Sequence, residues 1–224
     1  FSIASTQYAV LGGLAALFSI ESTRIVGNWK NSEALFSRAL GIYPESGLAH
    51  LNLGLYYRQI KDYDKALAVY TEGIQNSRGY LQLYANRSRI LLDRGQADLA
   101  LADLNYCLSK NPNMVNALTN RGVAHAMKND LDSGLIDLTR ALKLEPNEPD
   151  VLSNRGLVFY QMGRYAESID DLKAYIALKQ EDADSINLLG LAYMNGGQGD
   201  KALSEFNRSI QMKPNESAFY YNRS

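Results

Sequence analysis

The chain has 224 residues, of which 46% are hydrophobic and 21% are charged, and its formal net charge is −1. Charges of both signs are mixed along the chain without a polybasic tract, which argues against nucleic acid as a partner. One cysteine excludes an internal disulfide, and two histidines far apart in sequence offer no metal-ligand set. We therefore expect no metal, no cofactor and no nucleic-acid partner.

The first twenty residues carry no charge, and residues 8–20 are strongly apolar. Twenty helical residues span roughly 30 Å, about the thickness of a membrane's hydrocarbon core. We interpret residues 1–26 as an apolar helix, the end of a transmembrane segment that leads into the first repeat, so residues 1–20 would bring the protein to a membrane. The alternative is a helix that caps the first repeat. A capping helix needs a polar outer side, which residues 8–20 lack.

Beyond residue 27 the chain repeats with a period of 34 residues. Prolines at positions 44, 112, 146 and 214 are separated by multiples of that period. A second column holds very small side chains, namely Gly54, Ser88, Gly122, Gly156, Gly190 and Ser224. A third holds branched aliphatic side chains, namely Leu40, Ile74, Leu108, Leu142, Ile176 and Ile210. Three columns in phase indicate one repeated supersecondary unit, and a solenoid presents a long surface rather than one catalytic pocket.

Residues 115–148 show what the unit is. Apolar residues in the first half recur at three- and four-residue steps, as on one face of a helix. Asn129 and Asp130 break this pattern with capping chemistry, and a second apolar helical face follows until Pro146 stops it. Each unit is therefore predicted to be a helical hairpin, in which Gly122 lets the two helices approach closely.

The unit resembles the tetratricopeptide repeat (TPR), with a small residue at position 8, alanine at 20, a small residue at 27 and proline at 32. Two sets of residues show the pattern: Gly190, Ala202, Ser209 and Pro214, and Ser88, Ala100, Cys107 and Pro112. The resemblance implies an all-α protein, a right-handed α-solenoid of TPR helical hairpins, preceded by the apolar helix. The array is expected to cover residues 27–224: a degenerate unit to 46, full units at 47–80, 81–114, 115–148, 149–182 and 183–216, and a sixth that begins at 217.

The join between the apolar head and the repeats resembles a family of membrane proteins. In the transmembrane TPR O-mannosyltransferase-like family, a polytopic glycosyltransferase-like part precedes the TPR domain, and the resemblance here rests on Trp29 and the short segment around it. It implies that the catalytic part lies upstream and that no catalytic residue lies in this chain. We expect a membrane-associated protein with its array in an aqueous compartment, extracytoplasmic rather than cytoplasmic.

Asparagine recurs at position 6 of the units, on the first helix, which lines the concave groove in this family. The column comprises Asn52, Asn86, Asn120, Asn154 and Asn222, with Leu188 as the break. It resembles the asparagine ladder in the TPR superhelix of O-GlcNAc transferase, which implies a peptide-binding groove. An amide offers a donor and an acceptor on one planar group, so it can pair with both backbone groups of an extended peptide. The alternative is that each asparagine only bonds the neighbouring helix.

Arginine recurs at position 7, as Arg87, Arg121, Arg155 and Arg223. In three of these units aspartate stands at position 23, as Asp103, Asp137 and Asp171. We predict structural pairs that bridge the two helices of one hairpin: Arg87 with Asp103, Arg121 with Asp137 and Arg155 with Asp171. The alternative is an anion-binding stripe.

Three functions fit these patterns. The first is a protein–protein interaction scaffold without catalysis of its own, which binds an extended peptide or partner segment in an asparagine-lined groove. The second is the substrate-recruiting arm of a membrane glycosyltransferase. The third is a co-chaperone that clamps an acidic tail. The clamp ranks last because the groove-side positions 2, 5 and 9 are mostly neutral, with Arg89 as the main exception.

Overall fold

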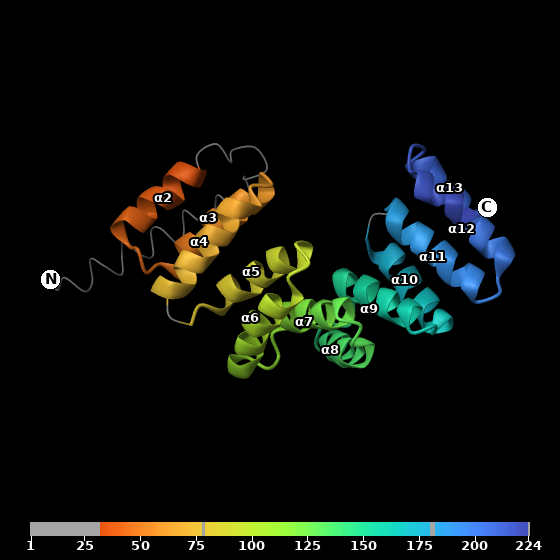
Figure 1. Cartoon of the computed structure of the whole chain (residues 1–224), viewed down its shortest axis with the longest axis horizontal. Coiled ribbons are helices and arrows are strands. Elements are labelled where there is room, and N and C mark those ends of the chain that lie inside the picture. The colour runs from red at the N-terminus through yellow and green to blue at the C-terminus, as the bar shows by residue number, and fades with distance from the viewer. Residues whose placement is uncertain (1–31, 78, 180–181, 224) are drawn as a thin grey trace. The chain divides into compact units, whose positions relative to one another are not determined.

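The computed structural model describes residues 32–77, 79–179 and 182–223, and within them every regular element is a helix (Figure 1). The all-α fold class is confirmed. The helices are α2 (Ser32–Ile42), α3 (Gly47–Gln59), α4 (Tyr63–Asn76), α5 (Leu81–Asp93), α6 (Ala97–Lys110), α7 (Val115–Met127), α8 (Leu131–Leu144), α9 (Pro149–Gln161), α10 (Tyr165–Leu178), α11 (Ala183–Asn195), α12 (Gly199–Met212) and α13 (Ser217–Arg223).

The predicted apolar helix at the head of the chain lies outside the described residues, as do residues 27–31 at the start of the degenerate unit. Among the helices that are described, none combines the length and the hydropathy that a membrane crossing requires.

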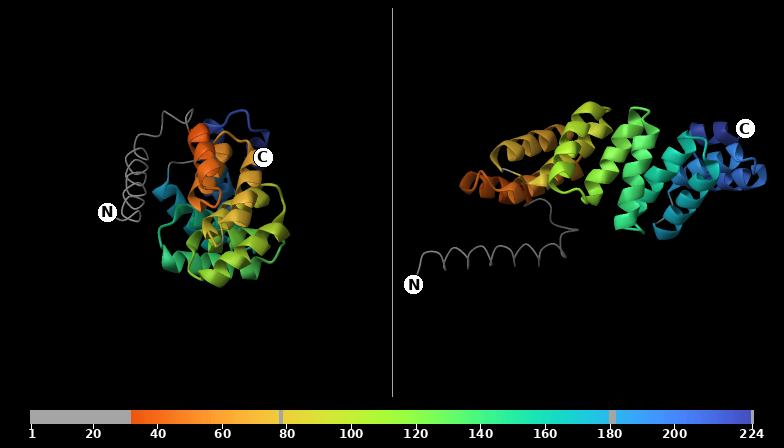
Figure 2. Two further views of the ribbon diagram at one scale, coloured as in Figure 1. Left: turned by 90° about the vertical axis from the view of Figure 1, so that its left-hand side faces the viewer. Right: turned by 90° about the horizontal axis from the view of Figure 1, so that it is seen from below.

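The described residues form two compact units, within 32–83 and within 84–223. In the first unit, α2 packs on α3 and α3 on α4. In the second, the pairs α7–α8, α9–α10 and α11–α12 are hairpins, each packed on the next (Figure 2). The first helices α3, α5, α7, α9 and α11 begin at residues 47, 81, 115, 149 and 183, so the helical register follows the 34-residue period of the sequence.

The turn inside each hairpin is set by one residue with a left-handed backbone. This residue is Lys61, Gly95, Asn129, Gly163 or Gly197, and each has φ between 61° and 75°. Glycine and asparagine adopt this region at lower cost than other residues. The predicted break at Asn129 and Asp130 is confirmed: α7 ends at Met127, and the Asp130 side chain accepts a hydrogen bond from the Ser133 N–H at the start of α8.

The small residue at position 8 stands where the two helices of a hairpin come closest. A Cβ on Gly122 would lie 2.7 Å from Leu138 Cγ and 3.1 Å from the Gly134 carbonyl oxygen. A Cβ on Gly190 would lie 2.7 Å from the Phe206 ring. Position 8 therefore admits only very small side chains, because the facing helix leaves no room for a larger one in a closely packed interior.

The 47–80 unit carries glycine at position 27 and tyrosine at position 24 of the repeat. Gly73 stands at position 27, where a Cβ would lie 2.6 Å from the Cβ of the buried His50. Tyr70 fills the position that Leu104, Leu138 and Leu172 fill in other units, and it is fully buried. The glycine at position 27 thus makes room for a histidine ring.

Candidate functional site

The arginine column bridges the two helices of each hairpin. Arg121 donates from Nε to Asp137 Oδ2 at 2.6 Å and from Nη2 to Asp137 Oδ1 at 2.8 Å. Arg87 with Asp103 and Arg155 with Asp171 have the same two-bond geometry at 2.7–2.8 Å. The aspartates are buried, and Asp137 is 4% exposed. A buried carboxylate requires such a partner, so this arrangement matches the structural interpretation of the column.

The hydrogen bonds to aspartate raise the pKa of Arg87 and of Arg121, because they favour the charged guanidinium. Arg121 also donates from Nη1 to Asn105 Oδ1 of the preceding hairpin at 3.0 Å. Arg223 makes the corresponding bond to Asn207 at 2.9 Å. Arg121 therefore joins its hairpin to the preceding one as well as bridging the two helices of its own hairpin, and Arg223 joins α13 to α12.

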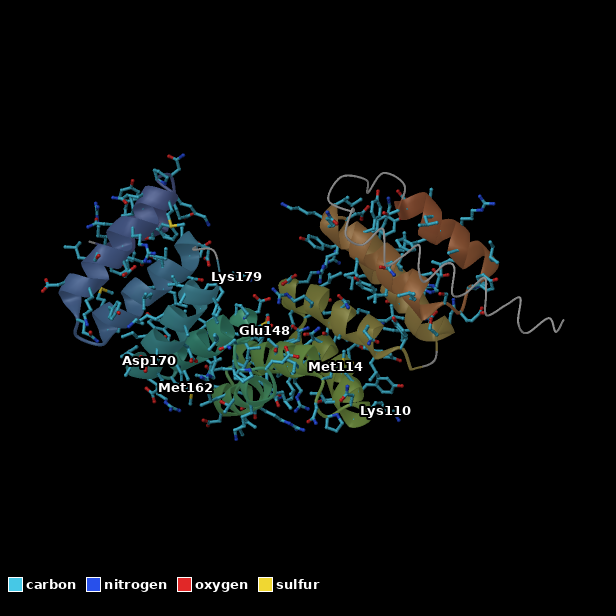
Figure 3. The ribbon with its side chains drawn as sticks, turned by 180° about the vertical axis from the view of Figure 1, so that it is seen from behind. Lys110, Met114, Glu148, Met162, Asp170 and Lys179 are labelled. Atoms are coloured by element: carbon cyan, nitrogen blue, oxygen red, sulfur yellow. The ribbon has the colours of Figure 1, made fainter. Side chains whose placement is uncertain are left out.

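A second repeated ion pair escaped the sequence analysis. Lys179 Nζ lies 2.6 Å from Asp150 Oδ1, and Lys213 Nζ lies 2.6 Å from Asp184 Oδ2. Each lysine follows the second helix of its hairpin and each aspartate lies in the first turn of the first helix, 29 residues earlier. The hydrogen bond to Asp150 raises the pKa of Lys179. The charge of Glu148, which lies near Lys179 in Figure 3, raises that pKa further. The signal was the recurrence of Asp at position 2 with Lys at position 31.

The exposed side of each first helix forms one stripe, at positions 2, 6, 9 and 13 of the 34-residue repeat. These positions are four, three and four residues apart, so they share one face of a helix. Within residues 84–223, every side chain of this stripe except that of Asn120 is half-buried or exposed. We call this stripe the first-helix face; it comprises Asn86, Arg89 and Asp93 on α5, Asn116, Asn120, Val123 and Met127 on α7, Asp150, Asn154, Leu157 and Gln161 on α9, and Asp184, Leu188, Leu191 and Asn195 on α11.

The stripes of successive first helices adjoin within the second unit. Helix α9 contacts both α7 and α11. Asn195 Nδ2 on α11 donates to the Tyr160 hydroxyl on α9 at 3.0 Å. Asn120 Nδ2 on α7 donates to the Ala85 carbonyl on α5 at 3.3 Å. The first-helix face is therefore continuous from α5 to α11.

The asparagine column does not have a single role. Asn120 is 9% exposed and its amide ties α7 to α5, which is the alternative that the sequence left open. Asn222 behaves alike, since its Nδ2 donates to Asn187 Oδ1 on α11 at 3.1 Å. Because the Asn120 amide is buried and bonded to another helix, the prediction that it faces a ligand is wrong for this residue.

Asn52 and Asn154 are oriented differently. The Nδ2 group of each donates to the backbone carbonyl four residues earlier, Leu48 at 2.8 Å and Asp150 at 2.7 Å. Both side chains are half-buried, as is that of Asn86 on α5. Because an amide has two donors and two acceptor lone pairs, one bond to the helix leaves capacity for a ligand.

The cysteine and one of the two histidines have structural surroundings. Burial raises the pKa of the Cys107 thiol to about 11, which keeps it protonated and unreactive at neutral pH. His125 Nδ1 lies 3.0 Å from Asp130 Oδ2, next to the turn of its hairpin. Within the described residues, no three His, Cys, Asp or Glu side chains are grouped as a metal site requires.

Family models of the tetratricopeptide repeat match most of the chain. One model matches residues 26–80 and 86–149, another matches 122–189, and a third matches 183–216.

Solved structures of other proteins share the fold at low identity. PilW, a widely conserved type IV pilus biogenesis factor, is 17% identical with a TM-score of 0.80, over 96% of this chain and 99% of that chain. A thermophilic TPR protein of Thermus thermophilus is 19% identical with a TM-score of 0.66, over 80% and 97%. YrrB, a TPR protein with an unusual peptide-binding site, is 17% identical with a TM-score of 0.61, over 83% and 96%.

Proposed function

Because the chain belongs to the tetratricopeptide repeat family, we propose that it is a protein–protein interaction scaffold that holds an extended partner segment on its first-helix face. The observation that carries this proposal is the continuity of the face from α5 to α11, with half-buried asparagines at the same position on α5 and α9. The peptide-binding site described for YrrB, a protein of the same fold, supports it.

Among residues 84–223, Asn86 and Asn154 carry the two amides that we assign to the partner. Each hydrogen bond to a peptide backbone contributes about 0.5–1.5 kcal/mol net. One substitution to alanine should therefore weaken binding slightly, and Asn86→Ala with Asn154→Ala should weaken it by about tenfold or more. Asn120 is left unchanged in this test, because its substitution would remove a hydrogen bond between α7 and α5.

Site-specific photo-crosslinking in cells tests the location. A benzophenone amino acid replaces Gln161 on the first-helix face or, as the control, Leu203 on α12, and both positions are exposed. We expect partner adducts from position 161 and none from 203, with fewer adducts from 161 in the Asn86→Ala, Asn154→Ala background. Adducts from 203 alone, or an unchanged yield in a folded double variant, would place the binding surface elsewhere.

Membrane attachment through residues 1–20 is a separate part of the proposal, supported by their lack of charge. The array would then work in the adjoining aqueous compartment, extracytoplasmic rather than cytoplasmic. As the alternative function, it would recruit substrates for a membrane glycosyltransferase.

Alkaline carbonate extraction of membranes tests the attachment. We expect residues 1–224 to stay in the pellet and a chain of residues 27–224 to be released, because only the longer chain carries the uncharged segment. Release of both chains would contradict attachment through residues 1–20.

A further inference from the structure

The charges on the first-helix face are neutralised by the protein itself. Arg89 lies 3.4 Å from Asp93 on the same helix. The other two charged members, Asp150 and Asp184, each pair with a lysine at 2.6 Å. A charged partner segment would have to compete with these pairs. The face thus offers neither a cationic clamp for an acidic tail nor a free anionic surface for a basic one.

Aliphatic side chains occupy the middle of the same face. At position 9, Val123, Leu157 and Leu191 follow one another on α7, α9 and α11, and Leu157 is 40% exposed. Leu188 stands beside Leu191 at position 6 of α11, and Met127 is exposed at the end of the α7 stripe. Removing these carbon atoms from water would favour binding of an apolar partner group.

We propose that the first-helix face selects an extended segment of another protein that carries no net charge and presents aliphatic side chains to position 9. The inference rests on the proposed scaffold function and adds the chemistry of its ligand. Neighbouring helix axes lie roughly 8–10 Å apart, and a segment in the extended polyproline II conformation rises about 3.1 Å per residue with three residues per turn. Consecutive aliphatic contacts would therefore fall about every third residue of the segment, with its backbone groups left for the asparagine amides.

Selection from a random 12-residue peptide display library on the full chain tests this chemistry. We expect enriched peptides with near-zero net charge and several Leu, Ile, Val or Met residues. Their affinity, measured by fluorescence anisotropy, should change by less than about twofold between 50 and 500 mM NaCl, because salt screens charge pairs and not apolar contacts.

A charge placed in the middle of the face gives the sharper measurement. Leu157→Asp puts an unpaired carboxylate at a half-exposed site and should weaken the selected peptides by about tenfold or more, since a charge is costly to desolvate. Leu203→Asp is the matched control, because Leu203 is 50% exposed on α12, away from the face. It should leave affinity within about twofold of the unchanged chain. Circular dichroism checks the helical content of both variants.

The outcomes separate the ligand chemistry from the scaffold function. Enrichment of acidic or basic peptides, with affinity lost in high salt, would overturn the inference and leave the scaffold function standing. The absence of any enriched peptide would count against both. Self-association of the chain that Leu157→Asp abolishes, measured by sedimentation, would overturn the inference by making a second copy the occupant.

Discussion

Replacing Arg121 with alanine is expected to lower the free energy of unfolding by about 3 kcal/mol. The substitution leaves Asp137, which is 4% exposed, as a buried carboxylate without its guanidinium. Breaking such a pair costs roughly 3–5 kcal/mol, and the low end applies because the Arg121 side chain is 24% exposed. The bond to Asn105 on the preceding hairpin is lost as well. Urea unfolding followed by circular dichroism measures the effect.

Two controls show whether the stranded charge is the cause. Lys128→Ala removes an ion pair with Asp98 in which both side chains are exposed, and should cost less than about 1 kcal/mol. Replacing both partners, as Arg121→Met with Asp137→Leu, should recover most of the loss, since no buried charge is left unpaired. A double variant as unstable as Arg121→Ala would attribute the loss to packing instead.

Replacing Gly190 with valine is expected to destabilise the protein by about 3 kcal/mol. Its Cβ would lie 2.7 Å from the Phe206 ring on the facing helix, and both residues are buried. The ring is rigid, so the helices α11 and α12 must separate or Phe206 must leave its position. The same urea titration measures the loss.

Gly199→Val is the matched control, at the start of α12 in the same hairpin. A Cβ at Gly199 would meet nothing within 4 Å, so we expect a change within about 0.5 kcal/mol. Phe206→Leu should partly rescue Gly190→Val, because leucine faces the glycine of the 115–148 and 149–182 units. Equal losses at residues 190 and 199 would mean that the contact with Phe206 does not set the cost.

The sequence by itself determined the helical hairpins and their register. Helix ends are specified locally, by the left-handed residue at the turn and by side chains such as Asp130 that cap the next helix. The partner of Arg121 was also readable, because Arg at position 7 and Asp at position 23 occur together in three units. Within one hairpin these two positions are fixed by helix geometry, so a recurring pair in sequence becomes a contact in space.

Only the tertiary structure decided what surrounds the candidate site. Asn120 and Asn154 hold the same position in their units, yet one amide reaches α5 and the other bonds its own helix. Sequence position could not separate them, because an amide has several partners of similar energy and small differences between neighbouring helices select one. Contacts that recur within a hairpin can be read from paired positions of the repeat, whereas contacts between successive hairpins depend on how the hairpins pack.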